Sequence, residues 1–157
     1  MKELTDLLAD RSAQFKRPRS PLPGDLRPSY RIALLALALD ACRGKRATLR
    51  KLYVLNWASK TAENRKDLQD ALSDGASKEV AVRFEPSMGR AIDFAVAERL
   101  LRPEGKGRLV LSEKGMKYAT DLQIAGCFQV EDAFFKLIGK GATESKIVKL
   151  LKSEEGF

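Results

Sequence analysis

The longest apolar run in the sequence, IALLALAL from Ile32 to Leu39, constrains the fold more than any other segment. Its alanine and leucine side chains extend nearly all the way round a helix, so protein must surround this helix on every side. The run is much shorter than the about 20 residues that a membrane span requires. We therefore predict a central buried helix from about Tyr30 to Cys42, capped by the Ser29 hydroxyl and ended by a left-handed Gly44.

Length and charge indicate one compact domain with an anionic partner. The chain has 157 residues, and 29 Lys and Arg against 21 Asp and Glu give a net charge of +8. This balance favours nucleic acid as a partner, although solubility alone also accounts for it. We expect no membrane span and no secretion signal. Cys42 and Cys127 are far apart and form no CxxC pair, which indicates a reducing, cytoplasmic location.

The sequence contains no histidine. Within this chain, that excludes a Ser-His-Asp or Cys-His catalytic site, a histidine-ligated zinc and a histidine general base. Two other motifs lack the context for catalysis. ESK at 144–146 matches the ExK of a nuclease core without the neighbouring strand, and GKGATESK at 139–146 follows a helix, unlike a phosphate-binding loop. We expect no enzyme, metal, cofactor or small-molecule substrate.

Residues 1–28 form a predicted N-terminal arm. A short helix carrying Leu4, Leu7 and Leu8 at helical spacing precedes a proline-rich linker. Because proline fixes φ and lacks a donor, the linker is neither helix nor central strand. The three leucines are a candidate docking stripe for a partner protein.

The middle of the chain alternates helices with turns. Thr48 is expected to cap the helix LRKLYVLNWASK, with Leu49 and Leu52 on its buried face and Arg50 and Lys51 on its other face. The polar segment AENRKDLQDALSDG predicts another helix. KEVAVRF alternates as a half-buried strand does, and a further helix then runs from Ser87 to Leu101.

A predicted hairpin follows, with strands at 100–102 and 108–112 around the turn PEGKG. Ser112 then caps the helix beginning EKGMKYATDL. Helices, a hairpin and a capped helix in this order resemble the winged helix-turn-helix family. We predict a mainly α fold with a small hairpin: a winged-helix domain at 29–125, followed at 126–157 by a helical extension, the second helix of which is capped by Thr143.

Two basic segments are candidate nucleic-acid contacts. The first is the cluster RGKRATLRK, which has no acidic residue, and the second is the hairpin tip. Cationic side chains there can contact phosphates in a sequence-independent way, although a solvated loop also carries such charges. The candidate residues are Arg43, Lys45, Arg46, Arg50, Lys51, Lys106 and Arg108.

The helix from Ser87 to Leu101 lies where a winged helix keeps its recognition helix, but its charges cancel, which argues against base reading. One face, which includes Met88 and Ile92, is expected to pack on the core. A second apolar stripe consists of Phe94, Ala97 and Leu101. Either the C-terminal helices cover this stripe or a partner protein does.

The run RPSYRIALLALALDACRGKRATLRKLYVLNWA, followed by VRFEPSMGRAIDFAVAERLL, resembles the small middle components of bacterial ABC-three-component, or Lamassu-like, antiphage systems. The resemblance covers residues 27 to about 122. It implies a small non-catalytic winged-helix subunit that sits with an SMC-like ATPase and an effector.

These observations together predict a scaffold subunit that bridges partner subunits and contacts DNA through backbone charge. The alternative is a free-standing dimeric winged-helix transcriptional regulator. A nuclease that depends on Glu144 is a third hypothesis.

Overall fold

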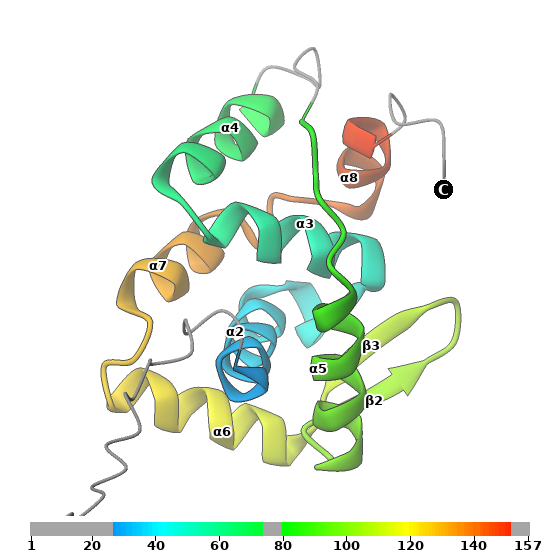
Figure 1. The fold of residues 1–157 in the computed structure, drawn as a ribbon, viewed down its shortest axis with the longest axis vertical. Helices are drawn as coiled ribbons and strands as arrows, with labels where there is room; N and C mark the ends of the chain where they lie inside the picture. Colours follow the sequence, from blue (N-terminus) through cyan, green and yellow to red (C-terminus); the bar gives the residue numbers. More distant parts are fainter. Residues whose placement is uncertain (1–26, 74–79, 152–157) are drawn as a thin grey trace, which may run out of the picture.

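The computed structural model describes residues 27–73 and 80–151. In this part of the chain there are seven helices and a small three-stranded antiparallel sheet (Figure 1). The elements are α2 (Pro28–Ala41), a 3-10 turn (Arg43–Lys45), β1 (Arg46–Thr48), α3 (Leu49–Ser59), α4 (Ala62–Ser73), α5 (Pro86–Ala97), β2 (Leu101–Glu104), β3 (Arg108–Leu111), α6 (Glu113–Ile124), α7 (Gln129–Ile138) and α8 (Glu144–Leu151).

Helix α2 is the centre of the fold, as its apolar composition predicts. Figure 1 shows it end-on, with α3, α5, α6 and α7 around it. Every residue from Ala33 to Leu39 is buried. The expected Ser29 cap is wrong, because the helix begins at Pro28, two residues before the predicted start at Tyr30. The missing N–H of Pro28 costs nothing in the first turn, where this donor has no partner within the helix. The helix ends at Ala41, and Gly44 takes its left-handed conformation in the following 3-10 turn.

The sheet has the strand order β1-β3-β2. The predicted hairpin is confirmed, and its strands are β2 (Leu101–Glu104) and β3 (Arg108–Leu111). Pro103 therefore lies in an edge strand, where its missing N–H is tolerated, and not in the turn. Strand β1 adds a third member, with Thr48 opposite Arg108. Side chains of the inner face, including Ala47 and Leu109, are buried.

The junction between the hairpin and α6 is tightly packed. The Ser112 hydroxyl accepts a hydrogen bond from the Gly115 N–H at 3.0 Å, which confirms the predicted cap. The same hydroxyl donates to the Arg99 carbonyl at 2.6 Å. A Cβ atom on Gly115 would lie 2.2 Å from the Leu100 carbonyl oxygen, so only glycine allows α6 to approach the base of the hairpin this closely.

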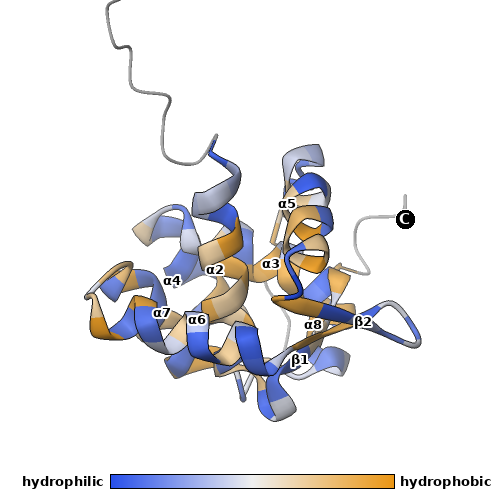
Figure 2. Cartoon of the chain, turned by 90° about the horizontal axis from the view of Figure 1, so that it is seen from below, coloured by the Kyte–Doolittle hydropathy of each residue, from blue (hydrophilic) through white to orange (hydrophobic). Residues whose placement is uncertain are grey.

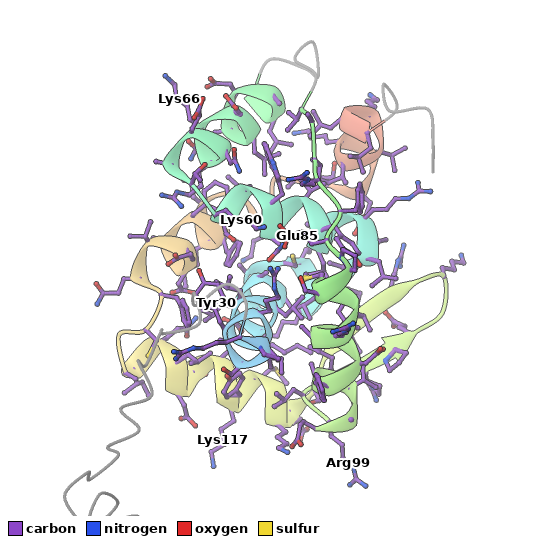
Figure 3. The ribbon with its side chains drawn as sticks, viewed as in Figure 1. Tyr30, Lys60, Lys66, Glu85, Arg99 and Lys117 are labelled. Atoms are coloured by element: carbon purple, nitrogen blue, oxygen red, sulfur yellow. The ribbon has the colours of Figure 1, made fainter. Side chains whose placement is uncertain are left out.

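The predicted strand in KEVAVRF is wrong within residues 80–84, which form no ladder. The predicted alternation is present, since Val80 and Val82 are buried while the residues next to Val82 are exposed. Glu85, at the end of this segment, pairs with Arg31 of α2 at 2.6 Å and with Lys60 after α3. Figure 3 shows Lys60 and Glu85 side by side near the middle of the molecule. These ion pairs hold the segment against α2 and α3.

Helix α5 begins at Pro86, one residue before the predicted start at Ser87, with Glu85 as its N-cap residue. The predicted C-terminal helices are confirmed as α7 and α8. The Thr143 hydroxyl accepts from the Lys146 N–H at 3.4 Å, at the start of α8. Phe135 and Ile147 are fully buried and belong to the same core cluster as α2.

Hydrophobic residues gather where α2, α3 and α5 meet, and the outer end of the hairpin is hydrophilic (Figure 2). None of the helices in the described ranges is long and apolar enough to cross a membrane.

Candidate functional site

A hollow of about 230 Å³, called the basic pocket below, lies between the sheet and the turn that joins α7 to α8. Cationic side chains from three separate parts of the chain reach it. Its lining residues are Arg43, Arg46, Ala47, Lys51, Arg108, Lys140, Thr143 and Glu144. The two basic segments that the sequence marks as separate candidates therefore meet at one place.

The sheet register brings the arginines of the basic pocket together. Arg46 and Thr48 are two residues apart in β1 and share one face of the sheet. Arg108 of β3 lies directly opposite Thr48, so its side chain points to that same face. Strand β1 is thus the element that aligns the α2–β1 turn with the hairpin.

Glu144 ties α8 to this edge of the sheet. Its carboxylate accepts from the Thr48 N–H at 3.0 Å and from the Thr48 hydroxyl at 2.6 Å. Both oxygens are therefore engaged in a link between the N-termini of α3 and α8. Within the described ranges, no group of three or more His, Cys, Asp and Glu side chains is gathered closely enough to hold a metal ion.

The predicted placement of Lys51 on the outer face of α3 is wrong. The residue is only 5% exposed, and its Nζ donates to the Gly139 carbonyl at 2.8 Å. A Cβ atom on Gly139 would lie 2.6 Å from the Ala41 carbonyl oxygen, so glycine lets the end of α7 pack against the end of α2. This close packing places the α7–α8 turn over the lysine.

The basic cluster RGKRATLRK contains no acidic residue, but two of its side chains form ion pairs with acidic residues from other parts of the chain. Lys45 pairs with Asp40 at 2.5 Å, and Arg46 pairs with Glu104 of β2 at 3.0 Å. Both acids lie outside the segment RGKRATLRK and reach it through the fold. By contrast, no hydrogen bond or ion pair within residues 27–73 and 80–151 engages the side chains of Arg43, Arg108 and Lys140.

Arg50 and Lys106 lie apart from the basic pocket. Arg50 is exposed on α3, and Lys106 is exposed at the hairpin turn with a left-handed φ of 67°. Neither lines the pocket.

Sequence reasoning misses Lys140 and Thr143 as pocket residues. Both lie in GKGATESK, which has no phosphate-loop context and for that reason carries no prediction of binding. The available signal is the pair of glycines with an intervening lysine, Gly139 to Gly141, between two helices. Only the tertiary packing at Gly139 brings that lysine to the sheet.

One of the two cysteines, Cys42, is buried at the end of α2. Cys42 is 2% exposed, and desolvation raises the pKa of its thiol, an effect that the nearby Lys51 ammonium only partly offsets. Cys127, the other cysteine, is exposed.

A second hollow, the apolar groove, separates α5 from the hairpin and has a volume of about 410 Å³. Its lining residues are Leu49, Ile92, Asp93, Val96, Ala97, Pro103, Glu104, Gly107, Arg108 and Leu109. One oxygen of Glu104 pairs with Arg46, whereas the other is buried without a hydrogen-bond partner in the described part of the chain. The groove is thus mainly apolar, and its charged lining residues are Asp93, Glu104 and Arg108.

The predicted apolar stripe is partly wrong. Helix α5 ends at Ala97, and Leu101 lies in β2, where it is 3% exposed and part of the core. Phe94 is 53% exposed and Ala97 is exposed, so the described helices α7 and α8 do not cover what remains of the stripe. The expectation of cover by the C-terminal helices is therefore wrong.

The N-terminal stripe of Leu4, Leu7 and Leu8 lies outside the described residues and stays a prediction. Comparison of the chain with models of known protein families, with curated proteins and with solved structures found no match.

Proposed function

We propose that this protein is a non-catalytic subunit that contacts the nucleic-acid backbone without sequence preference and joins a larger assembly. The observation that carries the proposal is the meeting of Arg43, Arg108 and Lys140 at one pocket, where no described group engages them. Unpaired cations that converge from neighbouring elements can contact the phosphates of a nucleic-acid backbone without reading its sequence.

The order of the elements supports a winged-helix interpretation, which suits this function. The order helix, strand, helix, helix, hairpin, with strand order β1-β3-β2, is that of a winged helix if α2, α3 and α5 are its three helices. Helix α4 and the segment at 80–85 are then inserted between the second and third. Helix α5 and the residues just after it have no net charge, because Arg90 and Arg99 balance Asp93 and Glu98. This balance favours contact with the nucleic-acid backbone over base reading.

The partner side of the proposal rests on α5. Phe94 is 53% exposed, and Ala97, three residues further along the same helix, lines the apolar groove. An apolar surface next to a groove is typical of a protein–protein contact. From the sequence resemblance, the partners would be an SMC-like ATPase and an effector subunit of an antiphage complex.

The nucleic-acid part is tested by measuring the affinity of the full chain for a fluorescent DNA duplex over a range of salt concentrations. Arg43→Gln combined with Arg108→Gln should weaken binding, and the salt slope should fall by about 0.9 for each phosphate that the variant no longer neutralises. Lys66→Gln combined with Lys117→Gln is the matched control, because it removes the same charge from exposed lysines on α4 and α6 (Figure 3). Equal weakening in both double variants would reject the pocket as the binding site for the backbone.

The same measurement separates the proposal from a free-standing regulator. A backbone-binding subunit should bind unrelated duplexes of one length with equal affinity. A dimer that protects a palindromic site and prefers it strongly over other sequences would overturn the proposal.

A further inference from the structure

The basic pocket has the features of a discrete anion site and not only of a positive surface. Its volume of about 230 Å³ is below the range of drug-sized ligand pockets, which begins at roughly 300 Å³. It therefore suits a small group with several oxygen atoms. This inference rests on the proposed function and names the ligand that the same site would take.

Lys51 is the residue that makes the pocket unusual. Its ammonium is buried and donates to a neutral carbonyl, and no carboxylate in the described part of the chain forms an ion pair with it. A buried charge without a counter-charge is costly. An anion in the basic pocket, which Lys51 lines, would supply that counter-charge.

The remaining lining residues favour phosphate over a carboxylate. Arg43 and Arg108 are planar donors suited to paired oxygens, and Lys140 adds a mobile ammonium. Thr143 adds a hydroxyl. The lining contains one carboxylate, Glu144, and both of its oxygens accept hydrogen bonds from Thr48, which gives this residue a structural role. A phosphate has enough oxygen atoms and negative charge to engage several of these donors together.

We propose that the basic pocket binds a single phosphate group between Arg43, Arg108 and Lys140, above the buried Lys51. The phosphate group belongs either to a nucleic-acid backbone or to a free phosphorylated molecule. In either case, a bound phosphate would join the α2–β1 turn, the hairpin and the α7–α8 turn, which adds stability to the folded chain.

The test measures the thermal unfolding midpoint of the full chain as inorganic phosphate replaces chloride at constant ionic strength. We expect the midpoint to rise with the logarithm of the phosphate concentration above the Kd, by about 5 °C or more when phosphate reaches 100 times its Kd. Lys140→Gln and Lys51→Met should each abolish this logarithmic rise, and Lys66→Gln should retain it. Lys140 is exposed, so its variant keeps the test valid even if Lys51→Met unfolds.

Phosphate also stabilises proteins in general through exclusion from their surface, but that effect grows in proportion to the phosphate concentration. A rise that is proportional to concentration throughout, or one of equal size in the Lys140→Gln variant, would overturn the phosphate site.

A competition arm identifies the source of the phosphate and separates this inference from the proposed function. If phosphate displaces bound DNA more strongly than chloride of equal ionic strength, the pocket takes a backbone phosphate. If phosphate binds saturably but the chain does not bind DNA, the site stands, its ligand is a free phosphorylated molecule and the proposed function fails. If DNA binds while phosphate gives no logarithmic rise in the midpoint, the proposed function stands and the discrete site fails.

Discussion

Glu144 accepts two hydrogen bonds from Thr48, one from the backbone N–H at 3.0 Å and one from the hydroxyl at 2.6 Å. The Thr48 hydroxyl in turn accepts from the Lys51 N–H at 3.2 Å. Thr48 ends β1 and caps α3, and Glu144 begins α8. The pair therefore fixes the last helix to the point where the first strand becomes a helix, at the edge of the basic pocket.

Replacing Glu144 with Gln should destabilise the fold. Glutamine has nearly the same shape but offers one neutral oxygen in place of a charged pair, so one charge-assisted bond to Thr48 disappears. We expect the free energy of unfolding to fall by about 1.5 kcal/mol, as measured by urea denaturation. Glu113→Gln is the control, because Glu113 also begins a helix and is exposed. Equal losses in the two variants would show that the Thr48 link contributes nothing.

Gly139→Ala should disrupt the packing beneath the basic pocket. The added Cβ would lie 2.6 Å from the Ala41 carbonyl oxygen, so α7 must move away from α2. We expect a loss of about 1 to 3 kcal/mol, as for other overpacked sites, measured by urea denaturation. Gly141→Ala, two residues on, meets only an ordinary contact at 3.8 Å and should change the free energy of unfolding little. A neutral Gly139→Ala variant would refute the close approach.

The parts of the fold that the sequence predicts are those with local signals. The central helix follows from an apolar composition on every side, and the caps at Thr48 and Ser112 follow from a hydroxyl at a helix start. Strand β1 escapes prediction because it has three residues and forms only by pairing with β3, about sixty positions later. Without β1, the meeting of the two basic segments cannot be foreseen.

The candidate site likewise combines residues that local signals identify with residues whose positions depend on tertiary packing. Arg43, Arg46 and Arg108 are candidates by charge, and the structure brings them together. The outward placement predicted for Lys51 is wrong because the α7–α8 turn covers that side of α3. This turn is far from α3 in the sequence, so no local pattern indicates the contact. Leu101 does not belong to the stripe because α5 ends four residues before it, and the chain then enters β2.

Gly115→Ala and Gly89→Ala should have opposite effects, although both glycines lie in the first turns of helices. A Cβ on Gly115 would clash with the Leu100 carbonyl oxygen at 2.2 Å, and we expect a loss of about 1 to 3 kcal/mol. A Cβ on Gly89 has nothing nearer than the Tyr53 hydroxyl at 4.0 Å. Alanine there should raise the free energy of unfolding by about 0.5 to 1 kcal/mol through helix propensity. Urea denaturation of both variants checks the signs, and a stable Gly115→Ala variant would contradict the hairpin contact.

Phe94→Asp should prevent assembly with the proposed partner subunits while leaving the chain folded. Phe94 is 53% exposed, so its replacement removes little core packing but places a charge in the proposed partner face. Co-purification from cells that express the tagged chain together with its neighbouring genes measures the loss. Ile124→Asp, which changes an 80% exposed apolar residue at the end of α6, should still co-purify. Retention of the partners by a folded Phe94→Asp variant would remove α5 from the interface.

The buried thiol of Cys42 should make the fold sensitive to alkaline pH. Because burial raises the pKa of Cys42, the folded state holds its proton more tightly than the unfolded state does. The resulting stabilisation is complete below the ordinary thiol pKa of about 8.5 and is lost as pH rises from there through the folded-state value. Urea denaturation at a series of pH values should show a smaller alkaline loss for Cys42→Ala than for the wild type. Cys127→Ala, which alters an exposed thiol, should follow the wild type, and parallel curves for all three proteins would mean that Cys42 ionisation does not limit stability.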